Sequence, residues 1–213
     1  WRMDDDVAGQ NMVEKLDALA DNLRQQNVGA ILLSRVESVN WLANIRGGDL
    51  PFTPVNLCFA LFDCQNGLTI LGDSERLAPV ADPSIAIVPL AELDSLLSLL
   101  TGDRLLVEPA SLPKSLASVI ETSDVAMVEG DCPVTYMKSR KNKTEINGFL
   151  RAHRHDGVAM VKFLHWLETV RPIDYTESQI ASELQKNTIN LNNQEKEIDR
   201  ANNAVQENQI RIQ

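Results

Sequence analysis

The first 130 residues alternate between two patterns of apolar positions. Residues 12–27 place apolar side chains three and four positions apart, at Val13, Leu16, Leu19, Ala20 and Leu23, which is the spacing of one helical face. The continuous apolar run at residues 28–34 has no such period and is typical of a short buried strand. Similar runs predict strands in residues 55–63, 68–71, 84–89, 103–109 and 125–129. Helical patterns fall in residues 37–45, 74–81, 90–100 and 113–121.

Strands that alternate with helices predict an α/β fold, in which helices cover a sheet. Asn66-Gly67, between two of the strand runs, is a hairpin signal, so we expect a mixed sheet. Beyond residue 137 the pattern is helical throughout. Asn142 with Glu145, and Thr176 with Gln179, have the spacing of helix capping boxes. The fold class is therefore α/β, with a mixed sheet flanked by helices and an all-helical C-terminal segment.

The formal net charge of −10 argues against nucleic acid or an anionic membrane as a partner, because such surfaces attract basic proteins. No run approaches the roughly 18 apolar residues of a membrane span, and the first residues do not read as a signal peptide. Cys58, Cys64 and Cys132 form no CxxC pair and cannot all be paired within one chain. Such cysteines are typical of a reducing compartment, so we expect a cytoplasmic protein with structural cysteines.

A cluster of His153, His155 and Asp156, followed by His165, raises the question of a metal site. On a helix the first two histidines point about 200° apart, so they cannot share a metal. One imidazole and one carboxylate are too few ligands for zinc. We therefore predict no metal here. The face expected to pack inward comprises Phe149, Ala152, Val158, Val161 and Leu164 or Leu167.

Two motifs resemble one known family. The stretch WLANIRGGDLPFTPV, residues 41–55, is similar to the motif that marks the middle domain of three-domain Xaa-Pro aminopeptidases (aminopeptidase P). The stretch KNKTEINGFLRAHRHDGVAMVKFLHWLE, residues 141–168, resembles the helix that opens their catalytic domain. The match runs from Trp1 to about Leu184, in family order. The chain is thus identified as a member of the creatinase/prolidase-type pita-bread metallopeptidase family.

The resemblance implies a creatinase-type α/β domain in residues 1–137. It further implies a linker and the first helices of a truncated pita-bread domain in residues 138–184. Enzymes of this family release an N-terminal residue that precedes proline, using two divalent metals, usually manganese, and are commonly dimers. The metal-ligand motifs are missing here, so we expect no cofactor in this chain and no activity from it alone. The expected role is non-catalytic support, through dimer contact and shaping of the substrate entrance; a peptide substrate is expected only for the full-length parent.

The best candidate site is the loop that contains Arg46, Gly47, Gly48 and Asp49. The two glycines would allow strained backbone angles, and the two charges could contact a charged end of the substrate. By resemblance, loops of this domain border the substrate entrance. The alternative interpretation, which we favour from sequence alone, is that Arg46 and Asp49 pair with each other and stiffen the loop.

Residues 185–213 form an unassigned tail with a weak heptad pattern. Apolar residues recur every seventh position, whereas the companion positions are mostly polar, which favours an exposed helix or a weak coiled coil. The recurring residues are Leu184, Leu191, Ile198, Val205 and Ile212. This tail keeps a second hypothesis open: a stand-alone protein-interaction module with a helical or coiled-coil tail.

Overall fold

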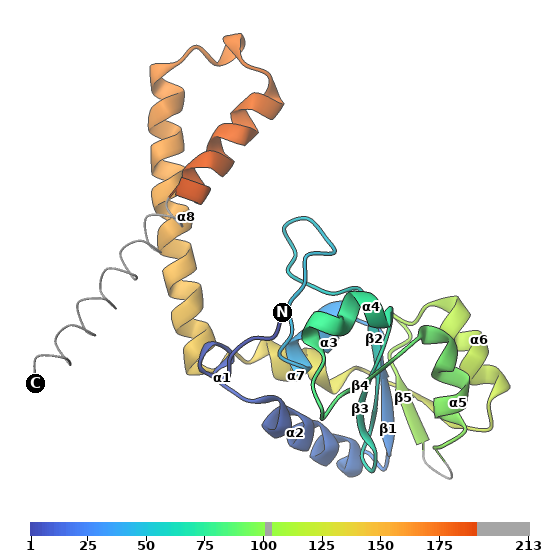
Figure 1. The fold of residues 1–213 in the computed structure, drawn as a ribbon. Helices are drawn as coiled ribbons and strands as arrows, with labels where there is room; N and C mark the ends of the chain where they lie inside the picture. Colours follow the sequence, from blue (N-terminus) through green and yellow to red (C-terminus); the bar gives the residue numbers. More distant parts are fainter. Residues whose placement is uncertain (101–103, 191–213) are drawn as a thin grey trace, which may run out of the picture. The chain divides into compact units, whose positions relative to one another are not determined.

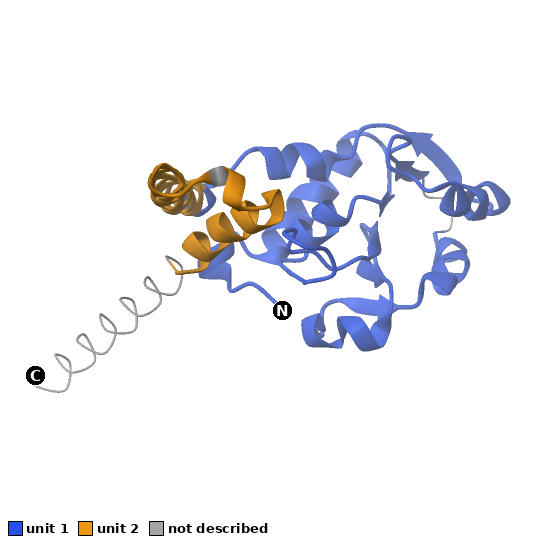
Figure 2. Cartoon of the chain, turned by 90° about the horizontal axis from the view of Figure 1, so that it is seen from above, with its two compact units in different colours: residues 1–145 blue, residues 146–213 orange. Residues whose placement is uncertain are grey.

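The computed structural model describes residues 1–100 and 104–190. The chain divides into two compact units, Trp1–Glu145 and Ile146–Gln213, which Figure 2 distinguishes by colour. We call them the α/β unit and the helical unit, and describe each by itself. The division predicted from sequence, with boundaries at residues 137 and 184, stays a prediction.

The α/β unit is built on one mixed sheet with strand order β4-β3-β2-β1-β5-β6. β1 and β2 are antiparallel, as are β2 and β3, whereas the other three neighbouring pairs are parallel. The strands are β1 Ala30–Leu33, β2 Phe59–Asp63, β3 Gly67–Leu71, β4 Ala86–Val88, β5 Arg104–Val107 and β6 Ala126–Glu129. Each lies inside a run predicted as a strand, or within one residue of it, and the antiparallel hairpin at Asn66-Gly67 confirms the mixed sheet.

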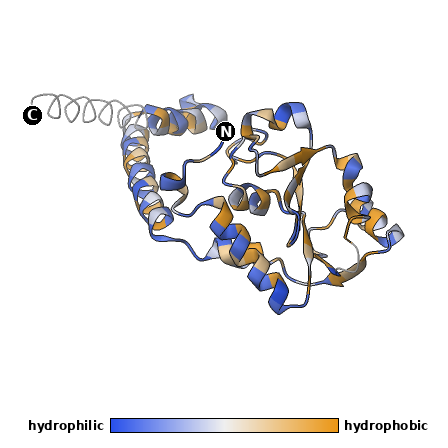
Figure 3. Ribbon diagram, turned by 60° about the horizontal axis from the view of Figure 1, so that its bottom comes forward, coloured by the Kyte–Doolittle hydropathy of each residue, from blue (hydrophilic) through white to orange (hydrophobic). Residues whose placement is uncertain are grey.

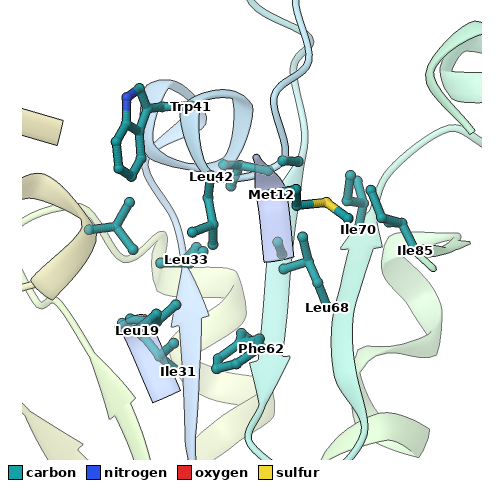
Figure 4. Packing of buried hydrophobic residues seen from close by; sticks show 14 of the residues in the cluster. Met12, Leu19, Ile31, Leu33, Trp41, Leu42, Phe62, Leu68, Ile70 and Ile85 are labelled. Carbon is teal, nitrogen blue, oxygen red and sulfur yellow. The ribbon is translucent and has the colours of Figure 1, made fainter. Parts of the chain in front are cut away.

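Both faces of the sheet are buried, which explains why the central strands read as continuous apolar runs. Along β1, Ile31 and Leu33 join the cluster on one face, while Ala30 and Leu32 join the cluster on the other. Phe62 on β2 lies on the same face as Ile31 (Figure 4). Successive side chains of a strand point to opposite faces, so two layers of helices are needed to exclude water.

The first cluster is covered by α2 Met12–Gln25, α3 Val36–Leu42, α4 Ser74–Leu77 and α7 Pro133–Ser139. The second is covered by α5 Leu93–Leu97 and α6 Lys114–Thr122, which lie on the opposite side of the sheet from α2 (Figure 1). Hydrophobic residues dominate the strands between these layers, as the ribbon coloured by hydropathy shows (Figure 3). The short elements are α1 Asp5–Ala8, η1 Ala78–Val80 and η2 Leu90–Glu92.

The predicted inward face of α2 is confirmed at Leu16, Leu19, Ala20 and Leu23 and is wrong at Val13. Val13 is 58% exposed, whereas Met12, Lys15, Leu19 and Leu23 are buried. Lys15 is a charged residue on the buried face, so the spacing of apolar residues alone did not identify its position, and it indicated Val13 instead. The helix α7 was also missed, because its basic sequence was interpreted as a link; Pro133 stands at its first turn, where the missing N–H costs nothing.

The cysteines Cys58 and Cys132 are buried in the first cluster, and Cys64 is half-buried. None of the three is in a disulfide. Burial raises the pKa of the Cys58 thiol to about 12 and also raises that of Cys132. Cys58 and Cys132 therefore act as small apolar core residues, as predicted.

The helical unit consists, in its described part, of most of α8 Lys143–Thr169, of η3 Pro172–Asp174 and of helical residues 177–190. This agrees with the predicted all-helical segment. Phe163 and Trp166 stack at 6.0 Å between ring centroids, and Tyr175 meets Trp166 edge-on at 5.2 Å. The last 23 residues of the predicted heptad tail lie outside the described residues.

The prediction that one apolar face of α8 packs inward is wrong. Phe149, Val158, Val161 and Leu164 are all 45% exposed or more, and Ala159 is the buried residue of the helix. No helix among the described residues is long and apolar enough to cross a membrane.

Candidate substrate-entrance loop

The candidate residues lie at the base of a loop between α3 and β2, residues 46–57, which we call the entrance loop. It projects from the rest of the α/β unit (Figure 1). Its two arms pair through the backbone: Gly47 N donates to Pro54 O at 3.3 Å, and Asp49 N donates to Val55 O at 3.2 Å. The entrance loop is therefore an ordered hairpin-like arm.

A buried asparagine at the end of α3 holds the returning arm. Asn40 Nδ2 donates to Asn56 O at 2.9 Å, and Asn40 Oδ1 accepts from Asn56 N at 2.9 Å. Asn56 Nδ2 also donates to Asn40 Oδ1, at 3.0 Å. Both side chains are nearly inaccessible to water, so this double pairing replaces hydration for the backbone groups of Asn56.

The two glycines differ in their surroundings, and neither adopts the left-handed backbone conformation expected for strained glycines. A Cβ on Gly47 would lie 2.4 Å from Asn56 Oδ1 and 2.6 Å from Val55 O. Gly47 is thus required for the close approach of the two arms. A Cβ on Gly48 would meet nothing within 4 Å. The expectation of strained glycine angles was wrong.

Asp49 pairs with Arg76 of α4, and the predicted Arg46–Asp49 pair does not form. Arg76 Nη1 bonds to Asp49 Oδ2, and Arg76 Nη2 donates to Leu57 O at 2.6 Å. Asp49 Oδ2 also accepts from Leu57 N at 2.6 Å. An arginine far along the chain thus neutralises Asp49 and fixes the end of the entrance loop.

Arg46 keeps its charge without a carboxylate at ion-pair distance among the described residues. Its Nη1 donates to Ile45 O at 2.7 Å and Asn40 O at 3.2 Å. Burial lowers the pKa of Arg46, while the charge of Glu145 opposes that shift. The chain start is bonded here as well, since Trp1 N donates to Arg46 O at 2.7 Å. Arg46 is thus the one charge of the four candidate residues not neutralised by an ion pair.

The tip of the entrance loop presents an aromatic ring to solvent. Phe52 is 93% exposed and has a φ of 61°, a left-handed conformation that is uncommon for a bulky residue. Leu50 and Thr53 are bridged on either side of it, so the turn is closed. Exposed, ordered aromatic residues are typical of binding surfaces. Sequence reasoning missed Phe52, although Pro51 and Pro54 around it signal a rigid turn.

The described residues do not fit a two-metal centre. No group of three or more His, Cys, Asp or Glu side chains in residues 1–100 and 104–190 is placed to hold an ion. His153 contacts the ring of Phe149, with centroids 6.1 Å apart. A metal-activated hydrolysis needs several ligands for two ions about 3.5–4 Å apart, so no catalytic step is assigned to these residues.

Comparison with known proteins identifies the α/β unit. The sequence profile of the creatinase/prolidase N-terminal domain matches residues 1–145. The chain belongs to this family. The matched residues coincide with the compact unit Trp1–Glu145, which includes the first turn of α8.

Relatives of the creatinase-type chain are Xaa-Pro aminopeptidases. Xaa-Pro aminopeptidase 1 of Dictyostelium discoideum is 30% identical over 172 residues, which cover 78% of this chain and 27% of that protein. A probable Xaa-Pro aminopeptidase P of Laccaria bicolor is 29% identical over 184 residues, covering 79% of this chain and 27% of that protein. The chain therefore spans about a quarter of the length of these curated relatives.

Solved structures share the fold. The X-prolyl aminopeptidase of Caenorhabditis elegans, a cytosolic enzyme with a di-nuclear active site, superimposes with a TM-score of 0.75. It is 22% identical, and the match covers 88% of this chain and 32% of that one. An Xaa-Pro dipeptidase from Bacillus anthracis gives a TM-score of 0.66 at 20% identity, covering 84% of this chain and 49% of that one. The mixed sheet with flanking helices is thus the fold of this family.

Proposed function

We propose that this chain is the supporting, non-catalytic part of an Xaa-Pro aminopeptidase-like metallopeptidase. The observation that carries the proposal is the coincidence of the family match with the compact α/β unit, both ending at Glu145. The parent reaction would be release of an N-terminal residue that precedes proline. Two divalent metals, with manganese expected, would belong to a catalytic domain outside this chain, and the protein would work in the cytoplasm.

We propose that, in the parent enzyme, the entrance loop borders the opening through which the peptide substrate enters. Three features support this role: the arm is rigid at its base, Phe52 is presented at its tip, and Arg46 keeps an unpaired charge. An aromatic ring and a guanidinium suit a peptide, which offers apolar side chains and a carboxylate. Dimer contact is the second proposed role, and sedimentation equilibrium of the chain tests it directly.

The first experiment tests the chain alone. The pure chain, supplied with excess manganese and a peptide that begins Arg-Pro-Pro, is expected to show no turnover, because its described residues do not form a two-metal centre. Turnover that co-purifies with the chain and that a chelator abolishes would contradict the non-catalytic role.

The second experiment restores a catalytic domain. In a chimera, residues 1–145 replace the matching segment of the Dictyostelium Xaa-Pro aminopeptidase 1. We expect Xaa-Pro cleavage, with a KM for long peptides that rises when Phe52 is replaced by alanine, while kcat changes little. The control Leu99→Ala removes a side chain of similar character, 66% exposed and on another surface. A folded but inactive chimera would argue against the supporting role.

The exposed apolar residues of α8 keep the interaction-module hypothesis open. Phe149, Leu150, Val161 and Leu164 are each more than half exposed, and patches of this kind mark surfaces that another element covers. Under the first proposal the covering element is the catalytic domain, and under the second it is a separate partner. An active chimera that also carries α8 of this chain would favour the first.

A further inference from the structure

A lysine is buried against a tryptophan in the core of the α/β unit. Lys15 is 1% exposed, and its Nζ donates to Trp41 O at 2.9 Å and to Asn44 Oδ1 at 2.5 Å. The same Nζ lies 4.1 Å from the centroid of the Trp41 ring. A charge buried this deeply requires compensation, and the two oxygens with the ring face provide part of it.

The edge of the same indole holds the beginning of α8. Trp41 Nε1 donates to Glu145 Oε1 at 2.9 Å. Glu145 Oε2 accepts from Asn142 N at 2.9 Å, and Glu145 N donates to Asn142 Oδ1 at 2.9 Å. One carboxylate therefore serves both the capping box of α8 and the tryptophan of α3.

The N-terminal segment around α1 also contacts the residues at the start of α8. Asn142 Nδ2 donates to Ala8 O at 2.8 Å. Gly9, which follows, has a φ of 70°, and a Cβ there would lie 2.5 Å from Asn142 Oδ1 and 2.6 Å from Thr144 Cβ. The end of α1 thus approaches the first turn of α8 at a distance that only glycine permits.

We propose that Lys15, Trp41 and Glu145 form a charge-coupled anchor that fixes the first turn of α8 on the creatinase-type domain. The cation lies over the ring face and the anion accepts from the ring N–H, so each polarises the indole in the direction that strengthens the other contact. The anchor is a property of the α/β unit and does not depend on the proposed function. Lys15 and Glu145 are positioning residues in it.

The electrostatics support this coupling. Burial lowers the pKa of Lys15 to about 8, and the attraction to Glu145 is the largest effect that opposes the shift. Arg46 adds to the lowering and Asp5 opposes it. Lys15 and Glu145 therefore sense each other's charge although they form no direct ion pair.

The chain itself provides controls for capping alone. Asn11 and Glu14 form a capping box at the start of α2. Thr176 and Gln179 form another, in which an amide takes the place of the carboxylate. Glutamine is thus sufficient for capping. The substitution Glu145→Gln leaves one oxygen for the cap, replaces the oxygen that accepts from the Trp41 indole with an NH2 group and removes the charge that faces Lys15, while Glu14→Gln removes a charge from a capping box where no indole is bonded.

The experiment measures hydrogen exchange by NMR in the full chain, at the amides of Asn147 and Gly148 and at the Trp41 indole N–H. Lys15→Met and Glu145→Gln are each expected to lower protection there by about tenfold, within the range of a buried cation–π or charge-assisted contact. Because the two charges act together, the protection of the same protons in the double variant should also fall by about tenfold, not by a hundredfold.

Amides of β1 report whether each variant is folded. If Lys15→Met does not fold, Trp41→Phe, which keeps a ring over the lysine and removes the N–H, replaces it in the comparison. If the double variant loses about a hundredfold in protection, the two substitutions act independently, and the proposed anchor is wrong. A loss with Glu145→Gln no larger than that of Glu14→Gln at the start of α2 would overturn it as well.

Discussion

Asn40 Oδ1 accepts two hydrogen bonds from Asn56, one from the backbone nitrogen at 2.9 Å and one from the side-chain nitrogen at 3.0 Å. Asn40 Nδ2 returns a bond to the carbonyl of the same residue. The last part of α3 and the returning arm of the entrance loop are therefore joined by one pair of side chains. The position of the arm depends on this pair, because both residues are buried.

Replacing Asn40 by alanine should lower the free energy of unfolding by about 2–3 kcal/mol, since buried groups of Asn56 lose their partners. Urea denaturation measures the change. Asn22→Ala is the matched control, because Asn22 on α2 accepts a bond from Gln26 at the exposed surface; its cost should stay below about 1 kcal/mol. Equal losses in the two variants would contradict the role assigned to Asn40.

The two adjacent glycines of the entrance loop should respond differently to alanine. Gly47→Ala places a methyl group against Val55 O and Asn56 Oδ1, so about 1–3 kcal/mol of stability should be lost. Gly48→Ala meets no atom within 4 Å and needs no left-handed backbone; it should be neutral or slightly stabilising, by up to about 1 kcal/mol. Thermal unfolding of the pair measures this, and similar melting temperatures would show that the arms do not approach so closely.

The Asp49–Arg76 pair should show a measurable but modest coupling. A double-mutant cycle of Asp49→Asn and Arg76→Met should give about 0.5–1.5 kcal/mol, because the pair is partly exposed yet shares two bonds with Leu57. High salt should reduce this value. Proteolysis within the entrance loop should accelerate in both single variants. A coupling free energy of zero at low salt would mean that the pair does not hold the loop.

The sequence predicted the strands and helix starts well because these depend on near neighbours. Residues 28–34 formed a strand since both faces of β1 are buried, and the boxes at Asn142 and Thr176 join residues three positions apart. The residues of the candidate loop could be predicted from its glycines and prolines. Its chemistry was not, because Asp49 pairs with Arg76, 27 positions away.

Buried polar residues account for most of what sequence reasoning missed. Lys15 and Asn40 look like exposed helical positions, and only the tertiary structure supplies the partners that let them be buried. Likewise, the exposed apolar face of α8 was expected inside. Periodicity identifies an apolar face, but what covers that face is determined by other elements.

The buried Lys15 should give the stability of the α/β unit a distinctive dependence on pH. Its pKa is lowered from 10.5 to about 8, first of all by burial. Between these two values the unfolded chain holds a proton that the folded chain has released, so the unfolded state binds more protons. Stability from this group therefore rises with pH across that window, and below about pH 8 the cost of burying the charged amine is fully present.

The test compares the free energy of unfolding of the wild type with that of Lys15→Met between pH 7 and pH 10.5. The wild type should gain up to roughly 3 kcal/mol relative to the variant over this range, since each unit of pKa shift corresponds to about 1.4 kcal/mol. Taking the difference cancels the other groups that titrate in the window. The control Lys114→Met, at a side chain that is 85% exposed, should follow the wild type at every pH. A difference between wild type and Lys15→Met that stays constant, or that falls as the pH rises, would mean that the amine of Lys15 is not buried as a charge, because only the release of that charge links its burial to pH with this sign.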